Sequence, residues 1–138
     1  MRHRVWLIAL LNLNCGAGLP SPPRTAHPVS AFVSVPYPPP AALAETVPPR
    51  PDRQGVVWLD GEWIFRADSY VWRRGGWVVA PPEGRFAAWQ TRYRKDGRLE
   101  LASSSWYDAN ARPLPFIEPI APAVTPPNEL TSEVQTGR

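Results

Sequence analysis

The prolines of this chain leave only one stretch in which regular secondary structure can form. Of its 19 prolines, 11 lie in residues 16–53 and six in residues 113–138, whereas residues 54–112 contain only Pro81 and Pro82. Proline has no N–H to donate and a fixed φ, so it is excluded from helix interiors and central strands. The pattern predicts one small folded unit between two Pro-rich arms. At about 59 residues, this unit lies near the lower size limit for a stable hydrophobic core.

Short apolar segments separated by turn signals fill the unit, which we place at residues 55–112. VVWL and EWIF flank Asp60-Gly61, YVWR and WVVA flank a looser Gly-containing turn, and a longer third hairpin turns at residues 95–97. Aspartate followed by glycine between apolar runs is a strong hairpin signal, because glycine accepts positive φ at low cost. No stretch shows a sustained helical period. The sequence therefore predicts an all-β fold, a small antiparallel meander of about six short strands.

The pattern W-x-x-G-x-W occurs twice in this unit, at residues 58–63 and, fourteen residues later, at residues 72–77. We call these two segments the cassettes. Each predicts a hairpin in which the glycine supplies the turn, so that Trp58 faces Trp63 and Trp72 faces Trp77. Directly opposed aromatic side chains stabilise an antiparallel pair. A structural role is therefore the default for the motif residues, which are Trp58, Gly61, Trp63, Tyr70, Trp72, Gly75 and Trp77.

The doubled motif, the YVWRRGGW segment and the preceding Pro-rich stretch resemble bacterial envelope proteins with YXWGXW or WXXGXW repeats. Many of those proteins are described as lipoproteins of the outer membrane or periplasm. The resemblance covers about residues 48–112 and implies a location and an architecture, but no reaction. This chain departs from the strict pattern at Arg73, where the family has glycine, and it has only two complete cassettes.

The first residues have the layout of a secretory signal. Arg2 and Arg4 precede the apolar run VWLIALLNL, and small residues follow it, so residues 1–17 are expected to form a signal peptide. The run is shorter than the roughly 20 apolar residues that span a bilayer. Cys15 is a candidate for lipidation, which would tether the protein to a membrane. The alternative is ordinary cleavage after Ala17, with loss of Cys15. The first route predicts a protein tethered to the outer membrane of the cell envelope, and the second a periplasmic or secreted protein.

The two arms are expected to stay apart from the unit. Residues 18–54 predict a semi-rigid stalk, because clustered prolines favour polyproline II over helix and sheet. The segment PYPPP within this arm could instead be a ligand for an aromatic-lined groove. Residues 113–138 predict a Pro-rich tail that is disordered beyond about Pro119.

The unit lacks the side chains on which most enzymes depend. The only histidines are His3 and His27, and the only cysteine is Cys15, so all three lie outside residues 55–112. The commonest catalytic bases, thiol nucleophiles and zinc ligands are thus missing from the unit. Basic and acidic side chains are well mixed, which argues against a nucleic-acid partner. We expect no enzymatic activity, no cofactor and no metal site.

Two functions fit these features. The first is a structural or protein-interaction module of the envelope, which would dock a partner protein, for example through an edge strand. The second is a glycan-binding module that uses exposed tryptophan rings to bind peptidoglycan or polysaccharide. The exposure of the rings distinguishes the two. Because Trp, Tyr and Arg are enriched in contact surfaces, the candidate ligand contacts are Trp89, Tyr93, Trp106, Arg73, Arg92 and Arg94.

Overall fold

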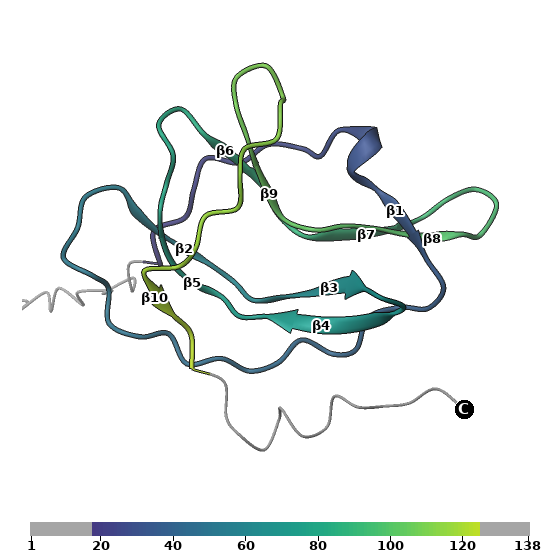
Figure 1. Cartoon of the computed structure of the whole chain (residues 1–138), viewed down its shortest axis with the longest axis horizontal. Coiled ribbons are helices and arrows are strands. Elements are labelled where there is room, and N and C mark those ends of the chain that lie inside the picture. Colours follow the sequence, from purple (N-terminus) through teal and green to yellow (C-terminus); the bar gives the residue numbers. More distant parts are fainter. Residues whose placement is uncertain (1–17, 125–138) are drawn as a thin grey trace, which may run out of the picture.

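The computed structural model describes residues 18–124 and has an all-β fold (Figure 1). All pairings between its strands are antiparallel, which confirms the predicted fold class. The described residues contain no helix that is long and apolar enough to cross a membrane. The predicted signal peptide, Cys15 and residues 125–138 lie outside the described part.

The described residues form one short helix and ten strands. The elements are η1 (Val29–Ala31), a 3-10 helix, and the strands β1 (Val33–Val35), β2 (Val56–Leu59), β3 (Glu62–Arg66), β4 (Ser69–Arg73), β5 (Gly76–Val79), β6 (Arg85–Ala87), β7 (Gln90–Tyr93), β8 (Leu99–Ala102), β9 (Ser105–Tyr107) and β10 (Ala121–Pro122).

Strands β2 to β5 form one long hairpin, which we call hairpin A. β2 and β3 make up one side, and they pair with β5 and β4 on the other side. The register does not shift between the two ladders, since Leu59 pairs with Gly76 and Glu62 pairs with Arg73. Two residues on each side, between these pairs, are left out of the ladder. Hairpin A is therefore one continuous antiparallel pair with a break in its middle.

The predicted pairing of the tryptophans is wrong. The cassettes lie on opposite sides of hairpin A instead of forming one hairpin each, so that Trp58 pairs with Trp77 and Trp63 pairs with Trp72. The turn is formed by Ala67-Asp68, in which both residues have positive φ. A two-residue turn of this kind matches the right-handed twist of the flanking strands. The Asp-Gly dipeptide before β3 thus lies at the break in hairpin A.

Strands β6 to β9 repeat this design in hairpin B. Ala87 pairs with Ser105 on one side of a two-residue break, and Gln90 pairs with Ala102 on the other. The turn contains Gly97, with a φ of +82°, and the predicted third hairpin with its Lys-Asp-Gly turn is confirmed. The breaks divide each long strand into two, and the arms add β1 and β10. The strands are therefore shorter and more numerous than the six that the sequence predicts.

The N-terminal arm packs against both hairpins, so the prediction that residues 18–54 form a stalk is wrong. β1 pairs with β8 and makes a three-stranded sheet of order β1-β8-β7. After β1, residues 36–48 run in an extended path beneath β3 and β4 in Figure 1 before the chain turns back into β2. We call residues 36–48 the strap.

Proline carbonyls explain why a Pro-rich arm can take part in this fold. The carbonyl of Pro20 accepts a hydrogen bond from the N–H of Trp58 at 2.8 Å, and that of Pro23 accepts one from Phe86 at 2.7 Å. Proline lacks a donor but keeps its acceptor. A Pro-rich segment can therefore satisfy the free N–H groups of a neighbouring strand without offering an N–H of its own.

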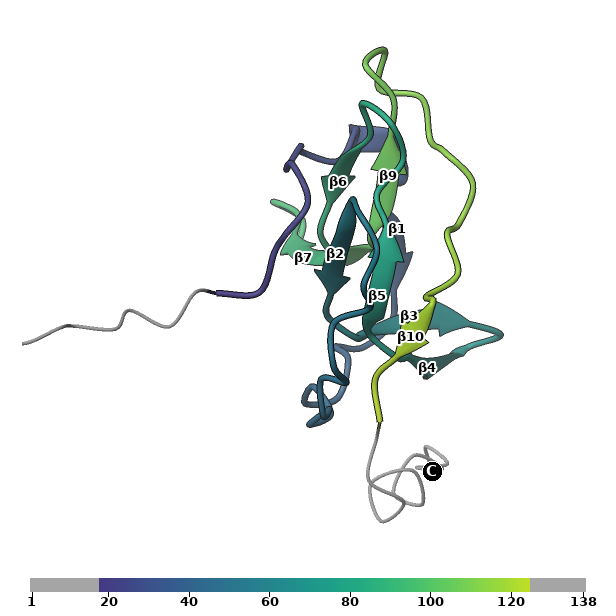
Figure 2. The same ribbon diagram turned by 90° about the vertical axis from the view of Figure 1, so that its left-hand side faces the viewer.

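Residues 113–124 also lie on the unit, and the predicted disorder beyond Pro119 is wrong as far as Val124. β10 pairs with β5, where Ala121 lies opposite Trp77. Val124 and Thr46 of the strap exchange two hydrogen bonds, at 2.9 and 3.1 Å. Figure 2 shows the first described residues and the segment leading to β10 on opposite sides of the strands.

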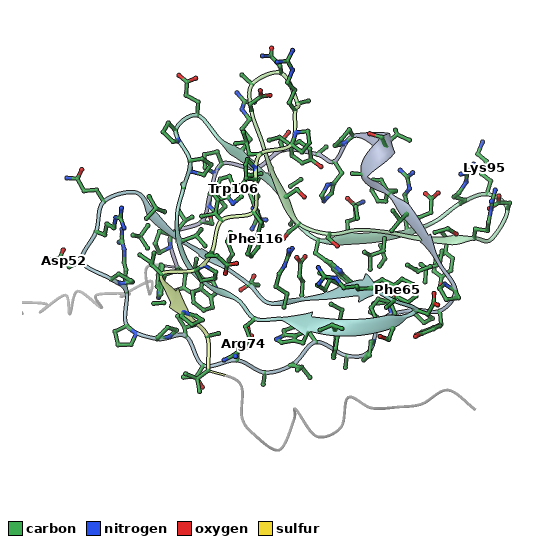
Figure 3. All side chains as sticks on the ribbon, in the orientation of Figure 1. Asp52, Phe65, Arg74, Lys95, Trp106 and Phe116 are labelled. Carbon is green, nitrogen blue, oxygen red and sulfur yellow. The ribbon has the colours of Figure 1, made fainter. Side chains whose placement is uncertain are left out.

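Apolar side chains pack in three clusters instead of one core. The first joins β1, β3, β4 and β8, the second joins β2 and β5 with Ala123, and the third joins β5, β6 and β9. β5 is buried on both faces, with Trp77 only 2% exposed and Val78 fully buried. Figure 3 shows Trp106 among packed side chains and Lys95 at the tip of hairpin B. Both arms contribute to the clusters, so the folded unit is larger than residues 55–112.

Candidate functional site

The four cassette tryptophans form two cross-strand pairs. The rings of Trp58 and Trp77 lie 5.4 Å apart at 70°, and those of Trp63 and Trp72 lie 5.1 Å apart at 71°. Both are edge-to-face contacts, a geometry that contributes about 0.5–1.5 kcal/mol per aromatic pair beyond the buried area. The motif therefore stabilises hairpin A, as predicted, but by joining the two cassettes to each other.

Three of these four indoles also bind the strap. Trp63 Nε1 donates to the carbonyl oxygen of Ala41 at 3.0 Å, and Trp77 Nε1 donates to that of Pro48 at 2.9 Å. Between them, Trp72 Nε1 donates to Glu45 Oε1 at 2.8 Å. The indoles thus contact an extended segment at three successive points along its length.

The glycines of the two cassettes make room for the Glu45 carboxylate. A Cβ at Gly61 would lie 2.6 Å from Glu45 Oε2, and a Cβ at Gly75 would lie 2.9 Å from the same oxygen. The Gly75 N–H faces the carboxylate, with distances from its nitrogen of 3.2 and 3.0 Å to Oε1 and Oε2. Trp72 Nε1 and Gly75 N–H, together with the space left by the two glycines, form a carboxylate site that we call the socket.

Glu45 was not among the residues singled out by the sequence. One signal could have pointed to it, because it is the only acidic residue in residues 18–51. An isolated carboxylate in an apolar, Pro-rich segment needs hydrogen-bond donors once the segment packs against a surface. Nothing in the spacing of the cassettes, however, shows that the donors lie on hairpin A.

A second carboxylate is buried at the break in hairpin A. Glu62 is only 5% exposed. Its carboxylate accepts a hydrogen bond from Nη2 of its cross-strand neighbour Arg73. It also accepts two hydrogen bonds from Ser104 of hairpin B, one from the backbone N–H at 3.0 Å and one from Oγ at 2.8 Å. Burial lowers the pKa of Arg73 below its ordinary value, and the ring of Phe116 lies 4.9 Å from the guanidinium. This network ties the two hairpins together at their breaks.

The six predicted ligand contacts do not form one surface. Arg73 is held by Glu62, and Arg92 and Arg94 both bind Glu100, at 2.7 and 3.3 Å. Trp89 is partly buried, and its Nε1 donates to the Trp63 carbonyl. Trp106 is buried, and Tyr93 is exposed. No tryptophan in residues 18–124 is exposed, since Trp72 and Trp89 are partly buried and the others are buried, so the fold does not present the open tryptophan faces that glycan stacking requires.

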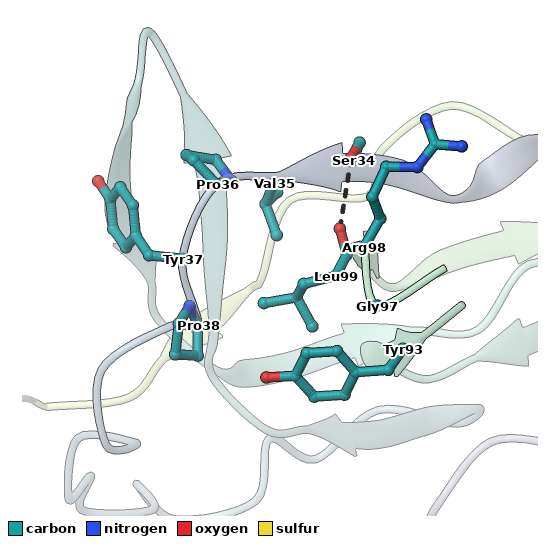
Figure 4. A pocket seen from close by; sticks show the side chains of 9 residues that line it. All are labelled: Ser34, Val35, Pro36, Tyr37, Pro38, Tyr93, Gly97, Arg98 and Leu99. Atoms are coloured by element: carbon teal, nitrogen blue, oxygen red, sulfur yellow. Dashed lines mark hydrogen bonds between the residues drawn. The ribbon is translucent and has the colours of Figure 1, made fainter. Parts of the chain in front are cut away.

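Tyr93 lies instead in an open groove of about 540 Å³ at the turn of hairpin B. Figure 4 shows Tyr37 and Tyr93 on its two sides, with Val35, Pro38 and Leu99 between them. Tyr37 belongs to the strap, and the sequence analysis did not single it out. The groove brings the strap and hairpin B together at the end of the molecule farthest from β10 (Figure 1).

The Glu100 cluster predicts a specific acid sensitivity. Hydrogen bonds from Arg92, and then from Arg94, hold the pKa of Glu100 below its ordinary value of 4.5. A carboxyl whose pKa falls on folding contributes stability above its unfolded pKa and loses it as the pH drops through the folded pKa. We expect Glu100→Gln to destabilise the protein at pH 7, and the difference from wild type to shrink below about pH 4.5. Thermal melts of both proteins from pH 7 to pH 3 measure this, and a difference that does not change with pH would contradict it.

No group of three or more His, Cys, Asp or Glu side chains within residues 18–124 is placed to hold a metal ion. The candidate site has two parts. One is the pair of cassettes with the strap that they bind, and the other is the groove at the N-terminal end of the strap. Comparison of the chain with protein-family models, with curated proteins and with solved structures finds no match in any of the three.

Proposed function

We propose that this protein is an exported, non-catalytic module of the bacterial cell envelope that acts through structural and protein–protein contacts. The observation that carries the proposal is the binding of an extended, acidic, Pro-flanked strap by the paired cassettes. Export is supported by the layout of residues 1–17, and the envelope location by the resemblance of the cassettes to envelope repeat proteins.

The chemistry of the strap contacts is that of peptide recognition. Indole N–H groups bind two main-chain carbonyls, and the socket binds one carboxylate. Carbonyl contacts read an extended backbone, and a single side-chain pocket adds selectivity, as in the known modes of peptide binding. A segment with a glutamate and flanking prolines satisfies these requirements, whether it belongs to the same chain or to a partner.

The packed arm changes how a tethered form would sit in the envelope. Pro20 is already bonded to β2, so only residues 16–19 separate it from Cys15. Five residue steps span at most about 18 Å. A protein lipidated at Cys15 would therefore hold its hairpins close to the membrane surface, and its partners would be membrane-proximal.

Intact mass spectrometry of the native protein from fractionated cells tests export. A mass that begins at Cys15 with acyl chains, or near Gly18 without them, supports an envelope module. A full-length mass in the cytoplasmic fraction would overturn the proposed location.

A peptide titration tests recognition separately. Glu45→Ala removes the carboxylate from the socket and leaves the Trp72 and Gly75 donors unpaired, at an expected loss of about 1–3 kcal/mol. A synthetic peptide of residues 36–50 should then bind this variant and raise its melting temperature. The same peptide with alanine at position 45 should bind at least about tenfold more weakly, since it lacks one charge-assisted contact. Equal effects of the two peptides would show that the socket does not select a carboxylate.

A further inference from the structure

The groove between Tyr37 and Tyr93 has the properties of a preformed binding surface. Tyr37 is 45% exposed and Tyr93 is 70% exposed. Tyr37 is fixed, because its hydroxyl donates to the carbonyl of Asp68 at 3.0 Å and its ring contacts Tyr70 edge-on at 5.5 Å. Pro36 and Pro38, which are conformationally restricted, complete the same wall. A rigid aromatic wall reduces the entropy lost when a ligand binds.

The groove offers hydrogen-bond donors, so it suits a ligand that carries hydrogen-bond acceptors. Within residues 18–124 the Tyr93 hydroxyl has no hydrogen-bond partner, and Arg98 uses Nε and Nη2 to bind Asp96, leaving Nη1 available. Apart from Ser34 and Gly97, the remaining lining is apolar and is formed by Val35 and Leu99 and the two prolines. A Pro-rich extended segment presents carbonyl acceptors and few N–H donors, and aromatic-lined grooves bind such segments.

A candidate occupant of the groove is the segment of residues 125–138, which lies outside the described residues and contains two prolines. Residues 125–138 begin with Thr-Pro-Pro and carry Glu129 and Glu133 against one basic residue, Arg138. The turn beside the groove has the opposite balance, with Arg94, Lys95 and Arg98 against Asp96 within the turn, and the neighbouring Glu100 is shared by Arg92 and Arg94. The signs of charge are therefore complementary, which favours encounter and fixes orientation.

The geometry points to a second copy as the source of this segment. Val124, from which the segment departs, is bonded to Thr46 and lies two residues after β10, which Figure 1 shows on the side of the molecule away from the turn of hairpin B. We propose that residues 125–138 of one copy bind the Tyr37–Tyr93 groove of another. Such a contact is head-to-tail, and it can be repeated from copy to copy into open chains. This inference does not depend on the socket, so either proposal can fail alone.

Sedimentation velocity of the exported form over a range of concentrations tests the inference. We expect the average mass to rise with concentration for the wild-type protein. Tyr93→Ala, a change at an exposed ring, should weaken association at least about tenfold, because an aromatic anchor contributes much of the affinity of such a contact. Deletion of residues 125–138 should do the same. Val29→Ala, at an exposed position outside the groove, is the matched control and should associate like wild type.

A mixture of the two defective variants gives the decisive result. Tyr93→Ala keeps the segment but lacks one aromatic wall of the groove, whereas the deletion variant keeps the groove but lacks the segment. Mixed together, they should form one-to-one dimers and nothing larger, at concentrations where neither variant associates appreciably alone. Wild-type protein that stays monomeric, association that survives Tyr93→Ala, or a mixture that does not dimerise would each overturn the inference. The inference would also be overturned if N-acetylated oligosaccharides bind at the groove and a peptide of residues 125–138 does not.

Discussion

Gly75→Ala is expected to destabilise the protein by about 3 kcal/mol or more, the upper range for overpacking a buried site. The added Cβ would lie 2.5 Å from the carbonyl oxygen of Leu59 and 2.7 Å from the nitrogen of Gly61. Both atoms belong to the backbone of the facing side of hairpin A, at the end of β2 and in the break, so no side chain can move to relieve the overlap. The Glu45 carboxylate would be displaced as well, at 2.9 Å from the new atom.

A thermal melt measures this effect. For a domain of about 100 residues, 3 kcal/mol corresponds to a fall in melting temperature of about 12 °C or more. Gly18→Ala is the control, because a Cβ at Gly18 meets no atom within 4 Å; it should melt like wild type. If both variants melt alike, the close approach of the two strands at the cassettes does not exist in solution.

Glu62→Ala is expected to lower the free energy of unfolding by about 3–5 kcal/mol, the usual loss when one partner of a buried ion pair is removed. The substitution leaves the partly buried Arg73 guanidinium without its carboxylate, with only the Ser104 carbonyl and hydroxyl as acceptors among residues 18–124, and it leaves the Ser104 N–H without an acceptor. A charge without its counter-ion and an N–H without an acceptor at the junction of the hairpins account for the size of the effect.

Chemical denaturation of a matched set checks this prediction. Asp96→Asn breaks an exposed pair with Arg98 and should change stability by less than about 1 kcal/mol. The double variant Glu62→Leu with Arg73→Leu should recover most of the loss, because an apolar pair of similar volume leaves no buried charge. A double variant as unstable as Glu62→Ala alone would mean that the ion pair itself, and not the unpaired charge, determines stability.

The sequence analysis identified the fold class and the structural role of the tryptophans, and it located the turn of hairpin B. These features depend on neighbours in the sequence. Alternating side chains in β7 and the Lys-Asp-Gly turn act over a few residues, so they can be recognised without knowing the rest of the fold.

The pairing of the cassettes could not be predicted in the same way. An arrangement with Trp58 opposite Trp63 and one with Trp58 opposite Trp77 both place tryptophans across from each other. The choice depends on the turn at Ala67-Asp68, which contains no glycine and gives only a weak turn signal. It also depends on Glu45, whose carboxylate occupies the space where the two glycines meet. Glu45 is thirty residues away from Gly75 in the chain.

What the sequence by itself determined is where the two hairpins form, because proline and glycine act on the backbone locally; it did not predict β1 and β10, which the Pro-rich arms add to the hairpins. Only the tertiary structure decided what the Pro-rich arm does. The same residues that prevent the arm from making a sheet of its own leave its carbonyls free, and Pro20, Pro23 and Pro48 supply acceptors to Trp58, Phe86 and Trp77. Whether a carbonyl finds such a donor depends on contacts between residues far apart in the chain, and no local pattern records them.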